Sequence, residues 1–257
     1  MDSFRTQDLA KMPVSALTIA ACCGVYVYQR VKDTDLSKIW FSYNQIVAKK
    51  EFWRIVTSAY THGGLLHLGM NMFTTFQQGM SFEAYIGWLN FSKAIYFLVM
   101  LSALVTLVVS FILNRMGYSQ YANMPAVGYS GVLFGIFALE SLQRPFDTVL
   151  LLYFIPVPFI VVPFIYLVVM QVLVPNVSFI GHAAGIAAGY LTYFLRINRW
   201  FDSIAFGIAL ALTATVSVYS YKKIHGRSQH WELPSHSSSA GGGGGKARIV
   251  NGVLIRS

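Results

Sequence analysis

The chain is built mainly from long apolar stretches that are separated by shorter polar connections. Seven such stretches follow one another in the hydropathy pattern: Val14–Tyr28, Leu65–Ile86, Ala94–Leu113, Val127–Leu142, Thr148–Val174, Ile180–Leu195 and Ile204–Tyr221. A bilayer-spanning helix needs about 20 mostly apolar residues, with a range of about 17–25. The pattern therefore predicts an all-α, polytopic membrane protein, in which several stretches are shorter or more polar than helices that only anchor.

Two segments depart from this simple pattern. The fifth stretch carries Pro156, Pro158 and Pro163, so we expect it to be kinked or to begin as a loop. The connection Gln29–Gly64 mixes aromatic side chains with charges, which is typical of a segment lying in the membrane interface. The sequence contains no visible internal repeat, so it gives no support to an inverted-repeat transporter.

These features divide the chain into four parts. We expect an N-terminal segment at 1–13, a membrane-embedded core at 14–200, an additional helix at 201–222 and a flexible tail at 223–257. The additional helix is either a further membrane span or an interfacial segment. The tail is rich in serine and glycine, as flexible linkers are.

Composition and charge support the membrane prediction. Of the residues, 55% are hydrophobic and 11% are charged, whereas an ordinary soluble domain carries about 25% charged residues. Thirteen charged residues lie in 1–54, seven in 222–257 and only nine in the 167 residues between. The net charge of +9 does not indicate a nucleic-acid partner, because the basic residues lie in loops and tails beside apolar spans. Lysine and arginine at such places face lipid headgroups.

Four strongly polar side chains interrupt the apolar stretches: His67 and Asn71 in the second, Ser130 in the fourth and His182 in the sixth. Such residues are costly inside a membrane and mark candidate functional sites. Each also has a structural interpretation. In the structural alternative, the serine hydroxyl bonds to a carbonyl of its own helix, the histidine is a packing residue between helices, and the asparagine joins helices by hydrogen bonds.

Glycines accompany the serine and the histidine. Ser130 stands in the motif Gly128-Tyr129-Ser130-Gly131 at the start of a predicted helix, where free backbone N–H groups can bind an anion. Gly185 and Gly189 follow His182 at i+3 and i+7, on one helical face. Small residues let two helix backbones approach closely. Close approach would bring the serine hydroxyl within about 2.6–3.2 Å of the imidazole, as a nucleophile and its base require.

His67 and Asn71 are four residues apart and therefore lie on one face of a helix. Near Ser130, they would be able to donate hydrogen bonds to a developing oxyanion. The alternative is a polar pair whose hydrogen bonds are satisfied within the helix bundle.

Five pieces of the sequence, taken in order, resemble the motifs of the rhomboid intramembrane serine proteases. They are Trp53-Arg54, His62, His67-Leu68-Gly69-Met70-Asn71-Met72, Gly128-Tyr129-Ser130-Gly131 and Gly181-His182-Ala183-Ala184-Gly185. The resemblance covers roughly residues 10–200. It implies a rhomboid-like six-transmembrane-helix core, with Ile204–Tyr221 as a possible seventh C-terminal helix, and a Ser–His dyad without a third acidic member. It implies no metal and no cofactor.

The resemblance also implies roles for individual residues. Ser130 would be the nucleophile, and His182 the general base and later the general acid. His67 and Asn71 match the oxyanion-binding pair of the family, and Gly128 belongs with them.

The supporting residues are those that match motif positions around this centre. Phe134 matches the aromatic residue that stacks on the catalytic histidine. The remaining supporting residues are Gly131, Gly185, Gly189, Trp53 and Arg54.

The function predicted from these residues is that of a serine endopeptidase which cleaves transmembrane or juxtamembrane segments of membrane proteins in the lipid bilayer. The alternative is a catalytically inactive rhomboid-like adaptor that binds membrane helices for trafficking or degradation. Such relatives usually lack the serine or the histidine, or carry proline before the serine, whereas Tyr129 precedes Ser130. A channel or carrier is not favoured, because the spans carry no charged helix face.

Two features bear on location. The stretches Pro156-Val157-Pro158-Phe159 and Val127–Phe134 look most similar to endoplasmic-reticulum-type rhomboids, which favours the endoplasmic reticulum or Golgi. Orientation stays open. The connection Gln29–Gly64 holds six basic residues, so the positive-inside rule places it in the cytosol, whereas the family places it on the lumenal or extracellular side.

Overall fold

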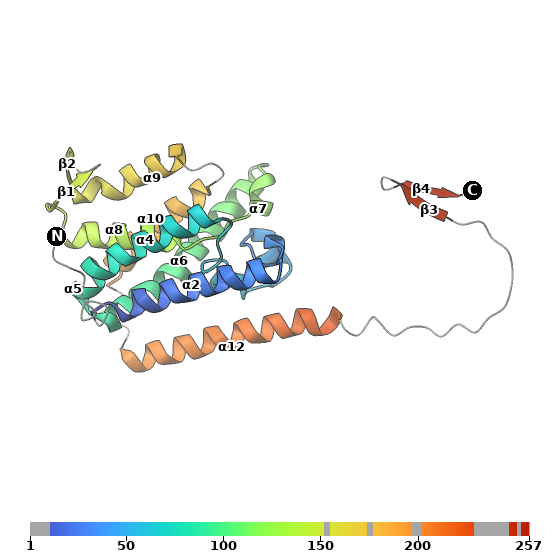
Figure 1. Ribbon diagram of the computed structural model, residues 1–257, viewed down its shortest axis with the longest axis horizontal. Coiled ribbons are helices and arrows are strands. Elements are labelled where there is room, and N and C mark those ends of the chain that lie inside the picture. The colour runs from blue at the N-terminus through green and yellow to red at the C-terminus, as the bar shows by residue number, and fades with distance from the viewer. Residues whose placement is uncertain are drawn as a thin grey trace. The chain divides into compact units, whose positions relative to one another are not determined.

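Helices form most of the chain in the computed structural model, which describes residues 11–151, 155–173, 177–196, 202–228, 247–250 and 253–256 (Figure 1). The chain forms two compact units, residues 1–223 and 224–257. The long helices are α2 (Pro13–Val31), α4 (Leu65–Gln78), α6 (Trp88–Arg115), α8 (Ser130–Gln143), α9 (Val162–Leu173), α10 (Phe179–Phe194) and α12 (Ser203–Ser228).

Shorter elements connect these helices. The single-turn helices are η1 (Leu36–Lys38), η2 (Asn44–Ala48), α3 (Arg54–Thr57), η3 (Gly79–Glu83), α5 (Ala84–Ile86), α7 (Gln120–Asn123) and η4 (Phe159–Val161). Two antiparallel hairpins are formed by β1 (Thr148–Leu151) with β2 (Ile155–Pro158) and by β3 (Ala247–Val250) with β4 (Val253–Arg256).

The lengths of the helices agree with a polytopic membrane protein. Within the described residues, α2, α6 and the Ser203–His225 part of α12 are long and apolar enough to cross a bilayer. Ser130–Gln143 and Phe159–Val172 are shorter apolar helices. The predicted all-α membrane fold is confirmed.

The fifth apolar stretch differs from a continuous span. Its first part is the β1–β2 hairpin, in which Thr148 pairs with Pro158 and Leu150 with Pro156, and helix α9 begins only at Val162. Proline lacks a backbone N–H and fixes φ, so Pro156 and Pro158 fit an edge strand and not a helix interior. The sequence predicts a kinked helix or a loop at the start of this stretch, whereas the structure has a β-hairpin there and a helix that is shorter than the apolar stretch.

The predicted tail also contains regular structure. Helix α12 continues to Ser228, and the segments 247–250 and 253–256 pair as β3 and β4. The glycine run Gly241–Gly245, the first ten residues and the predicted boundary at 200 lie outside the described residues.

Helix α2 is capped by a residue distant in sequence. Its own N-cap, Met12, offers no side-chain hydrogen bond. Instead, the fully buried carboxylate of Glu83 accepts hydrogen bonds from the backbone N–H groups of Val14 at 2.8 Å and Ser15 at 2.9 Å. A carboxylate at a helix N-terminus satisfies orphan donors and complements the helix dipole, so this contact joins the start of α2 to the end of the second span.

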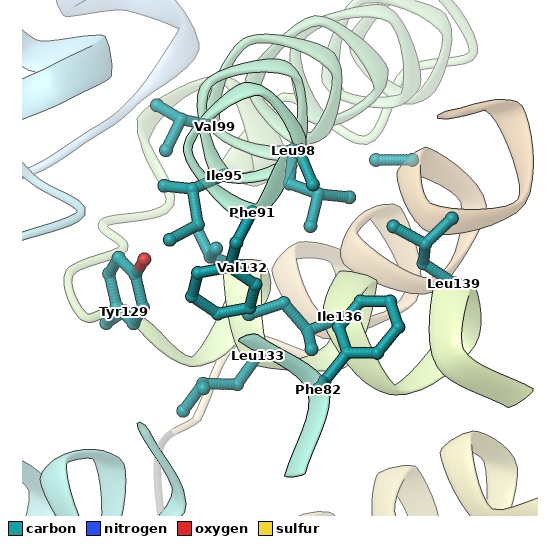
Figure 2. Packing of buried hydrophobic residues seen from close by; sticks show 12 residues of the cluster. Phe82, Phe91, Ile95, Leu98, Val99, Tyr129, Val132, Leu133, Ile136 and Leu139 are labelled. Atoms are coloured by element: carbon teal, nitrogen blue, oxygen red, sulfur yellow. The ribbon is translucent and has the colours of Figure 1, made fainter. Parts of the chain in front are cut away.

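Helix α8 is the centre of the main apolar core. Every residue from Val132 to Ser141 is buried, and α8 packs against α6, as Figure 2 shows for Leu98, Val99, Val132 and Ile136. Because α8 is mostly apolar and buried along nearly its whole length, it is a core helix. Its orientation is therefore set by its neighbours.

The contact between α8 and α10 depends on glycine. A Cβ atom added to Gly185 would collide with the carbonyl oxygen of Gly131, and one added to Gly189 would lie 2.7 Å from the Cβ of Ala138. A Cβ on Gly135 would lie 3.1 Å from the carbonyl oxygen of Gly185. The two backbones therefore interlock at a separation that no larger side chain permits.

Replacing Gly185 by valine is expected to lower the thermal unfolding midpoint, Tm, by about 2–12 °C. Overpacking typically costs about 1–3 kcal/mol, and each 1 kcal/mol shifts Tm by about 2–4 °C in a chain of this size. Thermal unfolding of the purified protein, followed by tryptophan fluorescence, measures this. The matched control is Gly24→Val in α2, where an added Cβ meets nothing within 4 Å. Equal Tm values for the two variants would show that α8 and α10 do not depend on this approach.

Candidate active site

The close contact of α8 and α10 brings Ser130 and His182 together. Ser130 is the first residue of α8, and His182 lies in the first turn of α10. The distance from Ser130 Oγ to His182 Nε2 is 2.8 Å, and both side chains are buried. This is the separation that a nucleophile and its general base require.

The local structure of α10 fixes the histidine. The side chain of Ser178 caps the helix by accepting a hydrogen bond from the Gly181 N–H at 3.1 Å, and its carbonyl accepts from the His182 N–H at 3.1 Å. The ring of Phe134, one turn after Ser130 on α8, lies 4.5 Å from the imidazole, centroid to centroid. The helix cap therefore fixes the backbone at His182, and the imidazole packs against an aromatic ring of the facing helix.

Gly128, His67 and Asn71 meet beside the serine. Gly128 has φ +121°, a conformation that favours glycine, and a Cβ there would lie 2.7 Å from His67 Nε2 and 3.7 Å from Asn71 Nδ2. The loop before Ser130 thus passes directly over the face of α4 that carries His67 and Asn71. Among the described residues, the buried Asn71 Nδ2 has no hydrogen-bond acceptor. An orphaned buried donor is costly unless a ligand supplies its partner.

Backbone groups add to this concentration of donors. The first intrahelical hydrogen bonds of α8 start from Val132 N and Leu133 N, which leaves the preceding N–H groups at Ser130 and Gly131 without a helical acceptor. Helices α4, α8 and α10 all begin near this point, since His67, Ser130 and His182 lie in their first turns. Their positive dipole ends therefore favour negative charge at the site.

Several residues to which no prediction assigned a role hold the loop in place. The backbone N–H of Gly128 donates to the Ser58 carbonyl at 3.0 Å, and the N–H of Tyr129 donates to His62 Nε2 at 3.5 Å. Burial, together with the neighbouring His67, lowers the pKa of His62 to about 4, so its ring is neutral at pH 7 and Nε2 can accept. These are contacts between loops distant in the chain, and no local motif encodes them.

Phe41 and Ala126 form an antiparallel β-bridge, a reciprocal pair of backbone hydrogen bonds, which also holds this loop. Phe41 N–H donates to the Ala126 carbonyl at 2.9 Å, and Ala126 N–H donates to the Phe41 carbonyl at 3.0 Å. The bridge joins the loop before Ser130 to the α2–α4 connection, residues 32–64. The position of the serine therefore depends on that connection.

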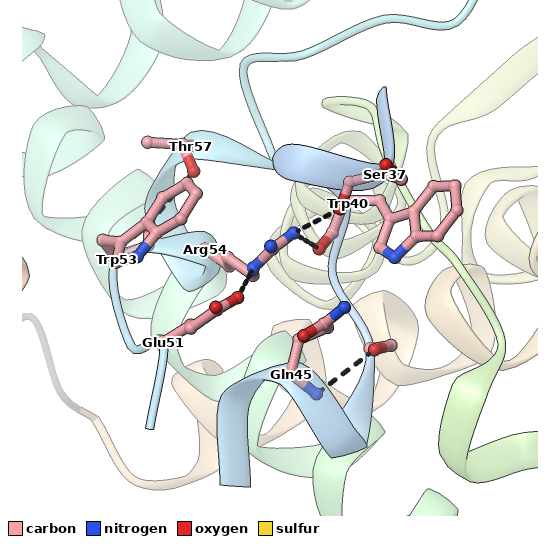
Figure 3. A network of polar contacts seen from close by, with 8 residues as sticks. Ser37, Trp40, Gln45, Glu51, Trp53, Arg54 and Thr57 are labelled. Atoms are coloured by element: carbon pink, nitrogen blue, oxygen red, sulfur yellow. Dashed lines mark hydrogen bonds and ion pairs between the residues drawn. The ribbon is translucent and has the colours of Figure 1, made fainter. Parts of the chain in front are cut away.

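Trp53 and Arg54 stabilise the α2–α4 connection and do not contact the dyad. The Arg54 guanidinium is paired with Glu51 and donates to the carbonyl oxygens of Trp40 at 2.9 Å and Ser37 at 3.1 Å (Figure 3). It also lies 4.8 Å from the ring of Trp53. These two predicted site residues therefore support the site indirectly, because they stabilise the connection that borders it.

A cavity of about 550 Å³ opens beside the dyad. Its wall includes Ser130, His182, His67 and Gly128 from the site. It also includes Trp40 and Phe41 of the α2–α4 connection and Ser102 and Thr106 of α6. The cavity is mostly apolar, and residues with hydroxyl groups are among those that line it, as is common for binding sites. Among the described residues, no group of three or more His, Cys, Asp or Glu side chains is placed to hold a metal ion.

Comparison with known proteins agrees with this geometry. Residues 49–199 match the family model of the rhomboid domain. The chain is 33% identical over 191 residues to Rhomboid-like protein 14, mitochondrial, of Arabidopsis thaliana, covering 70% of this chain and 55% of that protein. It is 28% identical over 195 residues to Rhomboid-related protein 4 of Homo sapiens, covering 72% and 62%.

A shorter match involves a relative that is named a protease. Over 81 residues, the chain is 36% identical to Rhomboid-type serine protease 2 of Debaryomyces hansenii, covering 29% of this chain and 28% of that protein. The chain spans only about half to three-fifths of the length of the two longer-matching relatives. The family model, however, covers more than half of the chain and includes Ser130 and His182. The chain is therefore a member of the rhomboid family.

Proposed function

We propose that the protein is an intramembrane serine endopeptidase that cleaves transmembrane or juxtamembrane segments of other membrane proteins. The observation that carries this proposal is the 2.8 Å contact between Ser130 Oγ and His182 Nε2. Membership of a family with members named serine proteases supports it. An inactive adaptor that binds membrane helices would not need this contact.

In the proposed reaction, the two side chains act as a dyad. Ser130 Oγ attacks the scissile carbonyl carbon while His182 Nε2 accepts the hydroxyl proton, and the imidazolium then gives that proton to the leaving amine. Water then attacks the acyl-enzyme carbonyl while His182 accepts a proton from the water. The bond to Ser130 Oγ breaks, the imidazolium returns the proton to Oγ, and the carboxylic acid product leaves. Among the described residues, His182 Nδ1 has no hydrogen-bond partner. The ring of Phe134 would therefore orient the imidazole. In a catalytic triad, a carboxylate has this role.

The charge that develops on the substrate oxygen would be stabilised by donors already in place. Asn71 Nδ2 and His67 lie beside Gly128, and the Ser130 backbone N–H, two residues further along the chain, has no helical acceptor. Donors fixed before the reaction lower the barrier because they need no rearrangement when charge appears.

The substrate must present an extended segment. Peptide groups of a membrane helix are already hydrogen-bonded, so the helix has to unwind before its carbonyl can reach Ser130. Segments that contain glycine or proline unwind at lower cost. We therefore propose membrane helices with such residues near one interface as the substrate class.

We further propose that residues 14–200 form the protease core, that α12 is an additional membrane span and that the protein resides in the endoplasmic reticulum or Golgi. The hydropathy of Ser203–His225 supports the span. The likeness of Val127–Phe134 and Pro156–Phe159 to endoplasmic-reticulum-type rhomboids supports the location.

Imaging of the protein with a C-terminal fluorescent tag tests the location. We expect the signal to coincide with endoplasmic-reticulum or Golgi markers, as the endomembrane likeness implies. A mitochondrial signal would contradict the proposed location. Mitochondria are the alternative to test, because one relative is named a mitochondrial protein.

Ser130→Ala and His182→Ala are each expected to reduce cleavage of a reconstituted membrane substrate by at least about 10⁴-fold. The first variant lacks the nucleophile, and the second leaves the hydroxyl without a base. Cleavage in proteoliposomes, quantified by gel, measures the effect. Ser141→Ala is the matched control, since this serine is buried on the same helix and its side chain bonds to the Ala138 carbonyl and to the Tyr190 side chain. Retained proteolysis in either dyad variant would refute the proposed function.

Asn71→Ala is expected to lower kcat by about 10²–10³-fold while KM changes little. An oxyanion donor binds the transition state better than the ground state, so its loss acts on turnover. Residual activity should remain, because nucleophile and base are intact. Asn90→Ala provides the control, since its side chain donates to the Ile86 carbonyl at an exposed site. Parental kcat in Asn71→Ala would identify Asn71 as a residue that only joins helices.

A further inference from the structure

Helix α12 lies outside the part of the chain that matches the rhomboid domain, which ends at residue 199. It nevertheless contacts the domain at two separate places along its length. One contact is with α6 and the other is with the α2–α4 connection. Because they lie at different points along α12, together they fix its orientation.

The first contact is with α6. The Tyr96 hydroxyl lies 2.8 Å from Thr213 Oγ1 and 3.3 Å from the Ala209 carbonyl oxygen. The Tyr96 ring also packs edge-on against Phe206, with 5.8 Å between centroids. Phe206 is buried although most of α12 is exposed, so this face of the helix is fixed against α6.

The second contact is with the α2–α4 connection. The ring of Tyr221, near the end of α12, meets the ring of Trp53 edge to face, with centroids 5.6 Å apart and planes at 85°. An edge-to-face pair of this kind stabilises beyond the area it buries. Trp53 is 7% exposed and Tyr221 is 48% exposed, so the tyrosine covers the outer edge of a buried tryptophan.

A continuous set of contacts leads from Trp53 to the dyad. The Trp53 ring packs on the guanidinium of Arg54, which donates to the Trp40 carbonyl. The next residue, Phe41, exchanges two backbone hydrogen bonds with Ala126. Ala126 is four residues before Ser130, and both Trp40 and Phe41 form part of the cavity wall.

We infer that α12 is a positioning element of the active site, which acts through Tyr221 on Trp53 and thereby holds the α2–α4 connection and the loop before Ser130. Tyr221 touches none of the reacting groups and is a positioning residue. The kinetic consequence rests on the proposed protease function, whereas the structural consequence does not.

The experiment compares hydrogen exchange and kinetics of the full chain in lipid nanodiscs. In Tyr221→Ala, we expect backbone amides of segments 36–42 and 123–129 to exchange about three- to tenfold faster, as the loss of one aromatic pair predicts. The value of kcat should fall by a similar factor, while KM changes less than about twofold. Exchange in the α6 segment 94–103 should not change, because the variant loosens one connection and leaves the core intact.

Two variants serve as controls. Tyr221→Phe keeps the ring, so exchange in segments 36–42 and 123–129 should rise less in this variant than in Tyr221→Ala. Tyr219→Ala removes a more exposed tyrosine of the same helix, whose ring is contacted by Lys223, and should also behave like the parent. If Tyr221→Ala is not obtained folded, Tyr221→Leu keeps apolar volume without the ring and should show the same acceleration.

Parental exchange in segments 36–42 and 123–129 of Tyr221→Ala would overturn the inference, whatever the activity. Equal acceleration in segment 94–103 would also overturn it, because the effect would then be general destabilisation. If the parent shows no cleavage that depends on Ser130, the proposed protease function fails. The exchange measurement still decides the role of α12 in that case.

Discussion

The site depends on the close approach of helices α8 and α10. Gly131 and Gly135 on one helix interlock with Gly185 and Gly189 on the other, and a single Cβ atom at Gly185 would collide with the opposing backbone. In a bilayer, no hydrophobic effect drives helices together, so backbone packing and hydrogen bonds have to hold them. The glycines make this packing possible, and the packing brings Ser130 into contact with His182.

The same packing accounts for a polar site within an apolar protein. Three helix N-termini meet where Ser130, His182 and His67 lie, and each brings backbone donors that its own helix does not use. These donors would be costly if they faced lipid. Around a cavity they form a ready site for an anion. Asn71 lies beside Gly128 and His67, and its buried Nδ2 has no hydrogen-bond partner among the residues that the structure describes.

The sequence predicted the components of this arrangement that are local. Glycines beside Ser130 and after His182, and the spacing of His67 and Asn71 on one helix face, are visible as motifs. The structure places these residues together, within reach of one another. The first, third, fourth and sixth apolar stretches likewise correspond to α2, α6, α8 and α10, because hydropathy reflects the lipid environment directly.

The sequence did not predict contacts between segments far apart in the chain. Glu83 caps α2 from 68 residues away, Ser58 holds the loop at Gly128, and Tyr221 covers Trp53. None of these pairs has a periodicity or a motif. The β1–β2 hairpin was missed for a different reason, since an apolar run with prolines is compatible with a kinked helix as well as with strands.

The central claim is that Ser130 is a nucleophile activated by His182. The most direct measurement is to treat the purified protein with a fluorophosphonate and to locate the adduct by mass spectrometry. The account predicts a single modified residue, Ser130, and loss of the modification in His182→Ala. No adduct on folded parent protein, or an adduct on Ser130 that forms equally fast without His182, would contradict it.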